Sequence, residues 1–306
     1  ATQHQDIYEE LQPKLNQQFD YFVKQYKAEL AHGNQVDVVD EDFLVFLKIY
    51  MLGFDHIQLN QQRHEADWLC QFNHIRSFRP RRISSFHNDR EITAPYDKYT
   101  FNFNKAFMAR ECFWAGEIQG KQIDLFYNKY PFAELHGICV PDKEACLPQL
   151  LTDDMYQYMW QLTSQLSQTV PGIGFGYNSY GAYASVNHLH FQMFVEADGL
   201  PIASTSWKHN NGKSEYPLNV YKYSDMNQAW QHIEQLHQDK QPYNLIFMPD
   251  ECYILPRKVQ GSVDVPIWSS GFTWYELAGA MLVFNQEDFK QLQSSSIETL
   301  LKQLNV

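Results

Sequence analysis

The sequence lacks the features that mark secreted and membrane proteins. It has no CxxC pair, and its five cysteines, an odd number, show no spacing typical of a disulfide framework. Its most apolar stretch, residues 43–54, is interrupted by Lys48 and is far shorter than the roughly 20 residues of a membrane span. The amino terminus has neither a basic start nor an apolar core. These absences predict a cytoplasmic protein with no membrane partner.

Positive charge is also scarce. Lys and Arg total 24 against 36 Asp and Glu, which gives a net charge of −12. So acidic a chain is a poor general binder of phosphate backbones, and we expect no nucleic-acid partner. The net negative charge still allows the protein to bind a small anionic ligand at a place where a few basic side chains converge. The densest basic cluster is Arg79, Arg81 and Arg82, which can bind phosphate groups or form a solvated surface turn.

The composition that remains is that of a globular protein, with 44% hydrophobic and 15% aromatic residues. Residues 5–54 repeat apolar side chains at steps of three and four, which predicts helices. We interpret residues 1–60 as a helical N-terminal cap that packs on the rest of the chain. Residues 61–306 contain no Gly-, Ser- or Pro-rich linker and are expected to form one structural unit.

From Trp68 onwards, short aromatic and β-branched runs alternate with turn residues, which predicts strands. Helical periodicity returns over residues 153–168 and 225–237, and again in the tail from Glu287. The expected fold is therefore α+β with an antiparallel core. Two segments, IDLFYNKYPFAELHGICVP and YNLIFMPDECYILPRK, both follow the order strand, turn, strand, Pro, which favours two related halves in one chain.

One strand carries an unusual polar face. In the run NHLHFQMF, residues 187–194, alternation places His188, His190 and Gln192 on one side and apolar residues on the other. The apolar side can pack on a core. Two imidazoles and an amide are costly to bury without partners, so the polar side needs an explanation.

Three interpretations of this polar face are open. The first is a solvated strand surface, and the second is a metal site in which the two histidines need a third ligand from elsewhere. The third is nucleophilic catalysis, in which a neutral imidazole attacks phosphorus and the phosphoramidate is passed to an acceptor. The third interpretation also accounts for Gln192, because an amide can donate to phosphoryl oxygens without adding a titrating group.

The string HLHFQ resembles the His-x-His-x-Gln motif of the histidine triad (HIT) superfamily, in the branch of galactose-1-phosphate uridylyltransferase, Ap4A phosphorylase and the GDP-hexose phosphorylases. The likeness is greatest to the GDP-L-galactose and GDP-D-glucose phosphorylases and extends over residues 68–290. It also rests on CQFNHIRSFRPRRI, PYDKYTFNFNK, DLFYNKYPFAELHGICVP, GYNSYGAYAS, YILPRK and YELAGAM, in the family's order. The resemblance implies a HIT-like antiparallel sheet with flanking helices.

The resemblance also implies roles for individual residues. His190 would be the nucleophile that becomes nucleotidylated, His188 would orient it, and Gln192 would bind the transferring phosphate. Leu135 stands before His136 where the superfamily usually has Gly. The candidates for binding the nucleotide or its phosphates are Asn128, His136, Asn104, Lys105, Asn187 and the three arginines Arg79, Arg81 and Arg82, with Phe103 beside the ribose or base.

The expected activity is nucleotidyl transfer through a covalent nucleotidyl-histidine. Its most specific form is phosphorolysis, in which GDP-hexose and phosphate give hexose-1-phosphate and GDP. The alternatives are a hexose-1-phosphate uridylyltransferase, a dinucleoside polyphosphate (Ap4A) phosphorylase or hydrolase, and a non-catalytic nucleotide-binding regulatory protein. We expect no cofactor, and no structural zinc of the uridylyltransferase kind, because the CxxC pair is missing.

Overall fold

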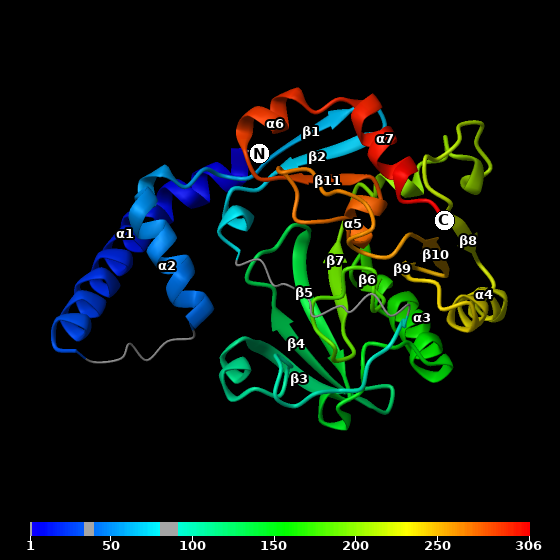
Figure 1. Ribbon diagram of the computed structural model, residues 1–306, viewed down its shortest axis with the longest axis horizontal. Helices are drawn as coiled ribbons and strands as arrows, with labels where there is room; N and C mark the ends of the chain where they lie inside the picture. Colours follow the sequence, from blue (N-terminus) through cyan, green and yellow to red (C-terminus); the bar gives the residue numbers. More distant parts are fainter. Residues whose placement is uncertain (1, 34–39, 80–90) are drawn as a thin grey trace.

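The structure is a computed structural model that describes residues 2–33, 40–79 and 91–306. Its larger sheet consists of β3 (Cys112–Ile118), β4 (Lys121–Tyr127), β5 (Glu134–Pro141), β6 (Ile173–Asn178), β7 (Phe191–Val195), β8 (Tyr221–Tyr223), β9 (Tyr243–Met248) and β10 (Glu251–Pro256). These strands run in the order β3-β4-β5-β7-β6-β9-β10-β8, and every pair is antiparallel (Figure 1). The antiparallel core expected from the sequence is confirmed.

Two helices cover one face of this sheet, α3 (Asp153–Ser167) and α4 (Met226–Gln238). Both begin where a side chain caps the first turn: Thr152 accepts from the amide of Met155, and Asp225 accepts from the amide of Gln228. The apolar side of α3 packs against strand residues in a buried cluster with Phe175. Both helices lie within one residue of the ranges predicted from periodicity.

The other face of the large sheet packs against a smaller sheet. This sheet contains β1 (Gln61–Glu65), β2 (Trp68–Phe72) and β11 (Ala280–Val283), in that order, flanked by α5 (Trp274–Leu277), α6 (Gln286–Gln291) and α7 (Ser294–Gln303). In this smaller sheet β2 and β11 are parallel. Parallel pairing needs a long crossover, and here the entire large sheet lies between the two strands in the chain.

The N-terminal helices, α1 (Thr2–Ala31) and α2 (Asp40–Leu52), form a hairpin that projects from the sheets (Figure 1). Its two helices meet through Phe19 and Tyr26, whose rings lie 5.2 and 4.8 Å from that of Phe46. Lys48 joins the hairpin to the body by donating to the Phe78 carbonyl at 3.0 Å. The predicted division at residue 60 into cap and main unit stays a prediction.

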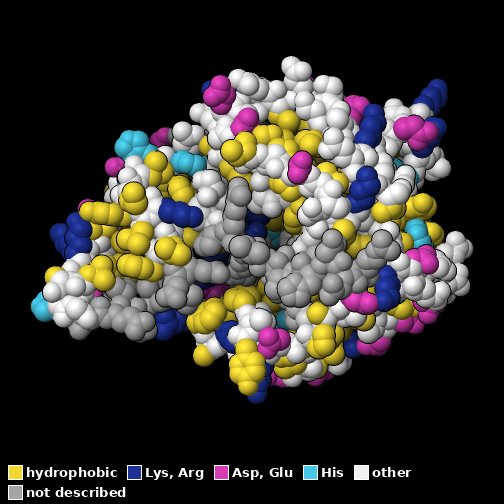
Figure 2. All heavy atoms as spheres, in the orientation of Figure 1, with side chains coloured by type: hydrophobic (Ala, Val, Ile, Leu, Met, Phe, Trp, Pro, Cys, Tyr) yellow, Lys and Arg dark blue, Asp and Glu magenta, His cyan; other side chains and the backbone are white. Residues whose placement is uncertain are grey.

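The hairpin leaves much of its apolar surface exposed, as the yellow side chains over these helices show (Figure 2). None of its described side chains is buried. The exposed large apolar residues are Leu11, Leu15, Tyr21, Phe22, Leu30, Leu44, Tyr50, Met51 and Leu52. The hairpin therefore adds little to the core, although its second helix reaches the rim of the cavity described below.

The two segments that suggested an internal repeat form the hairpins β4–β5 and β9–β10, on opposite sides of the central β6–β7 pair. A relation between two halves stays a prediction. All five cysteines are free thiols. Among the described residues, no helix has the length and apolar content needed to cross a membrane. A cytoplasmic location stays a prediction.

Candidate active site

A cavity of about 1140 Å³ lies against β7, β5 and β4. Gln192, Ile138 and Phe126 are register partners on these three strands and therefore point to the same side of the sheet. The apolar lining includes Phe101, Phe103, Phe107, Met108, Phe126 and Ile138, and the hydroxyl and amide groups include those of Ser185, Gln260, Ser269, Ser270, Thr273 and Asn285. Stacking surface and neutral polar groups thus share one cavity, which suits a nucleotide and a sugar.

His190 lines this cavity with its proton held on the far ring nitrogen. Its Nδ1 lies 2.8 Å from the main-chain carbonyl of His188, and since a carbonyl only accepts, Nδ1 must carry the hydrogen. In the neutral ring, Nε2 is then left with a lone pair. Burial lowers the pKa of His190 to about 4, so the ring is neutral near pH 7. Nε2 of His190 is therefore a ready nucleophile.

The main chain of His190 is clamped by Gln149, which the sequence analysis did not single out. The amide of His190 donates to Oε1 of Gln149 at 3.0 Å, and Nε2 of Gln149 donates to the His190 carbonyl at 3.2 Å. The same Nε2 also donates to the carbonyl of Asn178 on β6. Because β7 begins only at Phe191, this side chain supplies the hydrogen bonds that fix His190.

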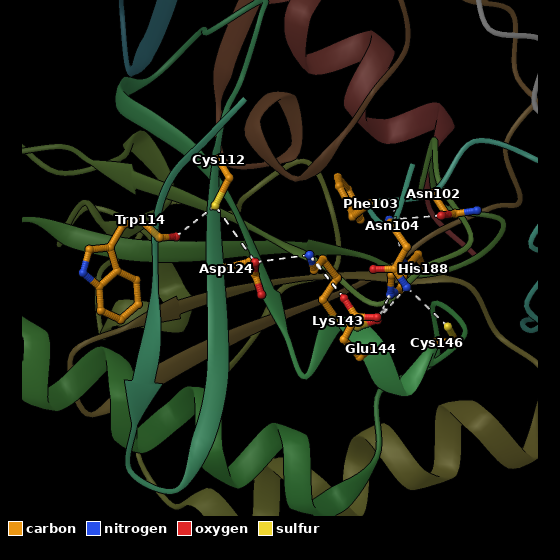
Figure 3. Close-up of polar contacts among 10 residues, drawn as sticks. All are labelled: Asn102, Phe103, Asn104, Cys112, Trp114, Asp124, Lys143, Glu144, Cys146 and His188. Carbon is orange, nitrogen blue, oxygen red and sulfur yellow. Dashed lines mark hydrogen bonds and ion pairs between the residues drawn. The ribbon is translucent and has the colours of Figure 1, made fainter. Parts of the chain in front are cut away.

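The side chain of His188 is occupied on both ring nitrogens (Figure 3). Its Nδ1 accepts from the amide of Phe103 at 3.2 Å, and its Nε2 donates to the carbonyl of Lys143 at 3.0 Å. Lys143 is itself paired with Asp124 at 3.4 Å. His188 therefore holds the loop of Phe103, whose ring centroid lies 5.3 Å from that of His190. It bonds to the His190 side chain through its own carbonyl rather than through its imidazole.

Gln192 is oriented by Trp274 from α5. The indole Nε1 donates to Oε1 of Gln192 at 2.8 Å, so the amide NH₂ is the group that can donate to a phosphoryl oxygen. The indole rests on β6, where a Cβ added to Gly176 would lie 2.2 Å from it. The Gly-rich run that forms β6 therefore makes room for aromatic rings. Trp274 is another residue that sequence reasoning missed.

Arg76 and Arg79 both line the cavity and carry positive charge into it. Arg76 is 4% exposed, donates to the Tyr130 carbonyl at 2.6 Å and lies 4.6 Å from the ring of Phe132, yet its Nε has no partner among the described residues. Burial, with the charge of Arg79 nearby, lowers the pKa of Arg76 to about 9. A buried cation with an unsatisfied donor favours an anionic ligand.

Of the predicted basic cluster, Arg81 and Arg82 lie outside the described residues. Arg76, which was not predicted, belongs to the 3₁₀ helix η2 (Ile75–Phe78) and sits three residues before Arg79. At that spacing two side chains can point to the same side of a tight helix. The sequence predicts strands from Trp68 onwards, and on a strand residues three apart lie on opposite sides.

Asn128 lines the cavity, whereas His136 lies behind it. Nε2 of His136 is 3.0 Å from Nδ2 of Asn128, and its Nδ1 accepts from the amide of Phe132 at 3.2 Å. Burial, aided by the charges of Arg76 and Arg79, lowers the pKa of His136 to about 3. The preceding Leu135 has a φ of 46°, a left-handed conformation that explains why Gly is usual at this position.

Three other predicted residues hold loops around the site and do not line the cavity. Asn104 donates to the Lys143 carbonyl at 3.2 Å, and Lys105 donates to the carbonyl of Lys98 at 2.8 Å. Asn187 donates to the carbonyls of Ala94 and Pro95 at 3.0 and 2.8 Å. Their contacts in this structure are therefore with the protein itself. Within the described residues, no three His, Cys, Asp or Glu side chains cluster as metal ligands.

Part of the sequence matches a known protein family. Residues 54–194 match the family model described as GDPGP1-like, N-terminal domain. This match covers slightly less than half of the chain. It ends two residues after Gln192, so it includes His190 and Gln192 but not Trp274.

Curated relatives bear names of one kind. GDP-D-glucose phosphorylase 1 of Xenopus laevis is 42% identical over 81 residues, 26% of this chain and 20% of that protein. The Danio rerio protein of the same name is 30% identical over 160 residues, 52% and 45% of the two chains. GDP-L-galactose phosphorylase 1 of Arabidopsis thaliana is 22% identical over 286 residues, 78% and 62%. The chain thus spans less than two thirds of the length of these relatives.

The fold is shared with a solved structure. Yeast Ap4A phosphorylase Apa2 superimposes with a TM-score of 0.54 at 12% identity, over 88% of this chain and 96% of that one. Its complex with Ap4A gives a TM-score of 0.53 at 13% identity, over 88% and 99%. This likeness confirms the HIT-like α+β fold expected from the sequence.

Proposed function

We propose that this protein transfers nucleotidyl groups through a covalent nucleotidyl-His190 and that its reaction is the phosphorolysis of a GDP-hexose. The hydrogen bond from Nδ1 of His190 to the His188 carbonyl carries the proposal, because it leaves Nε2 unprotonated at the cavity. The names of the relatives support the choice of GDP-hexose and phosphate as substrates.

In the first step, Nε2 attacks the α-phosphorus and the bond from that phosphorus to the bridging oxygen breaks. Hexose-1-phosphate leaves with the β-phosphorus. The imidazole becomes cationic as the new bond forms, and the His188 carbonyl that accepts from Nδ1 stabilises this charge. The NH₂ group of Gln192 and the guanidinium groups of Arg76 and Arg79 are suited to the charge that develops on the phosphoryl oxygens.

In the second step, inorganic phosphate attacks the same phosphorus, the N–P bond breaks, and GDP is released. The electron pair of that bond returns to Nε2, which regenerates the neutral ring. In this two-step mechanism the same histidine and the same phosphate-binding side chains serve both steps. Because burial keeps the pKa of His190 at about 4, the rate of adduct formation should not change between pH 6 and 8 through this group.

The test is the intact mass of the protein after mixing with GDP-glucose, UDP-glucose or Ap4A in phosphate-free buffer. We expect a GMP adduct that added phosphate discharges as GDP. His190→Asn should form no adduct and should lose about 10³-fold or more in turnover, because the nucleophile is gone. A UMP or AMP adduct would instead support the uridylyltransferase or the Ap4A enzyme.

His209→Asn provides the matched control. His209 is half-buried, bonds to the Ile202 carbonyl at 2.8 Å and does not line the cavity. This variant should form the adduct as the unmodified protein does. An adduct on His190→Asn would contradict the assignment, and tight GDP binding without adduct or turnover would support a regulatory protein instead.

A further inference from the structure

One edge of the cavity carries an ion-paired triad that the proposed chemistry does not use. Lys129 follows Asn128 and lies 3.2 Å from Oε1 of Glu111 and 2.8 Å from Oδ2 of Asp42. All three residues line the cavity. The side chains are 24% exposed for Glu111, 34% for Lys129 and 38% for Asp42, so solvent and a ligand can both reach them.

The triad lies at the distance from His190 that a nucleotide spans. Gln192, Ile138, Phe126 and Cys112 are successive register partners on β7, β5, β4 and β3, and Glu111 precedes Cys112. Three strand spacings of about 4.8 Å separate β7 from β3 by about 14 Å. An imidazole, a phosphate, a ribose and a base together fill such a distance. The base edge would then meet Glu111 and Lys129.

Between these ends the cavity offers stacking surface. The ring of Phe103 lies 5.3 Å from that of His190, Phe101 lies 6.0 Å from Phe103, and Phe107 lies 6.1 Å from Phe101. Phe107 belongs to the 3₁₀ helix η3 (Ala106–Arg110), which leads directly to Glu111. A flat ring held by these aromatic groups would present its edge to the carboxylate and the ammonium.

We propose that Glu111 and Lys129 recognise the Watson–Crick edge of guanine and thereby select a guanine nucleotide. Guanine presents an acceptor, O6, beside two donors, N1–H and N2–H₂. The Lys129 ammonium donates to O6, and the Glu111 carboxylate accepts from both donors. Adenine places an amino group opposite the ammonium and an unprotonated N1 opposite the carboxylate, so both contacts become unfavourable.

Asp42 balances the positive charge of Lys129 in the proposed guanine site. Nζ of Lys129 lies 2.9 and 2.8 Å from the two oxygens of Asp42, which offset its charge. The carboxylate of Glu111 is then available to the base. Because Asp42 belongs to α2, the projecting N-terminal hairpin contributes a group to the base site. This inference rests on the proposed function for the position of the nucleotide.

The experiment measures the binding of GMP, IMP and AMP to the full chain by calorimetry, since none of these carries a leaving group. IMP lacks only the 2-amino group of GMP. The unmodified protein should bind GMP about 10- to 100-fold more tightly than AMP, as expected for hydrogen bonds to a charged group. Glu111→Gln should remove most of the preference for GMP over IMP while leaving the affinity for IMP within about threefold.

Glu251→Gln is the matched control, because Glu251 pairs with Lys222 at 2.7 Å, is 24% exposed and does not line the cavity. It should leave all three affinities unchanged. Equal affinities for GMP and AMP in the unmodified protein would overturn the proposal. So would a Glu111→Gln variant that keeps its preference for GMP over IMP, or that weakens all three ligands equally.

The two proposals fail differently. If the preference for GMP depends on Glu111 but no mass adduct forms on His190, the guanine site stands and the transfer chemistry fails. If an adduct forms equally well from GDP-glucose and ADP-glucose, the chemistry stands and the guanine site fails. Binding of mononucleotides and covalent labelling thus report on separate parts of the cavity.

Discussion

At the scale of single residues, the site is defined by which nitrogen carries a proton. His188 uses both ring nitrogens to hold Phe103 and Lys143, and His190 uses only one. Of the two imidazoles in the motif, only His190 therefore has a lone pair to offer at the cavity. Gln192 is restricted in the same way, since Trp274 occupies its oxygen and leaves its NH₂ for a ligand.

Replacing Trp274 with Phe tests this restriction. The variant keeps an aromatic ring on Gly176 but loses the donor to Oε1 of Gln192. The amide can then rotate, and adduct formation from GDP-glucose should slow about 10-fold, the equivalent of one hydrogen bond. The rate follows from intact mass against time.

Trp160→Phe serves as the control, because Trp160 is 9% exposed on α3 and packs on the face of the sheet away from the cavity. Its rate should match that of the unmodified protein. An unchanged rate in Trp274→Phe would show that the indole does not position Gln192.

At the scale of elements, two glycines of β6 leave space for aromatic rings that pack against the strand. A Cβ on Gly174 would lie 2.4 Å from the ring of Phe194, and one on Gly176 would lie 2.2 Å from Trp274. These two rings stack on each other at 4.7 Å. The glycines therefore allow a layer of aromatic side chains to lie flat against a central strand, which is how α5 reaches Gln192.

A single methyl group at Gly176 should disturb this layer. Gly176→Ala should lower the free energy of unfolding by about 2 kcal/mol, because overpacking forces Trp274 to move, and should slow adduct formation at least as much as Trp274→Phe. Urea unfolding and the time course of intact mass measure the two effects.

Gly137→Ala on β5 is the comparison, since the tightest contact of its Cβ would be with the flexible end of Met193 at 3.2 Å, and its contacts with Phe126 and Phe113 at 3.5 and 3.7 Å are of ordinary length. We expect it to cost less than about 1 kcal/mol. If both variants lost the same free energy of unfolding, the cost of a side chain at Gly176 would come from the backbone and not from contact with the Trp274 indole.

The sequence predicted the elements whose evidence is local. Periodicity located α3 and α4, and alternation placed Gln192 on a strand. The predicted strand was too long at its start, because β7 begins at Phe191 and both His188 and His190 precede it. The contacts of Gln149, Trp274 and Arg76 could not be predicted, because their partners lie 29 to 82 residues away in the chain. The parallel pairing of β2 with β11 escaped prediction for the same reason.

At the scale of the whole molecule, burial of neutral imidazoles links the fold to pH. Burial lowers the pKa of His190 and His237 to about 4 and that of His136 to about 3, below the usual 6.5. Between these values the unfolded chain binds protons that the folded protein excludes, so stability falls as the pH drops below 6.5. Glu196 acts in the opposite direction, because burial raises its pKa to about 7.

Burial also raises the pKa of Glu276, but it lowers the pKa of His74, His188, His209 and His232. Because the histidines outnumber the two carboxyl groups, we predict a net loss of stability on acidification. Each group contributes about 1.4 kcal/mol per pH unit within its window. The urea midpoint should therefore be lower at pH 5.0 than at pH 7.5, and His190→Asn should reduce that difference. A midpoint that is equal or higher at pH 5.0 would contradict this account of the buried histidines.

The contact between Nδ1 of His190 and the carbonyl of His188 has an evolutionary consequence. The atom that fixes the tautomer of the nucleophile belongs to the main chain, which every amino acid possesses. No substitution at residue 188 can delete it, although a change of backbone conformation can displace it. The tautomer of His190 is thereby insulated from side-chain substitutions at residue 188.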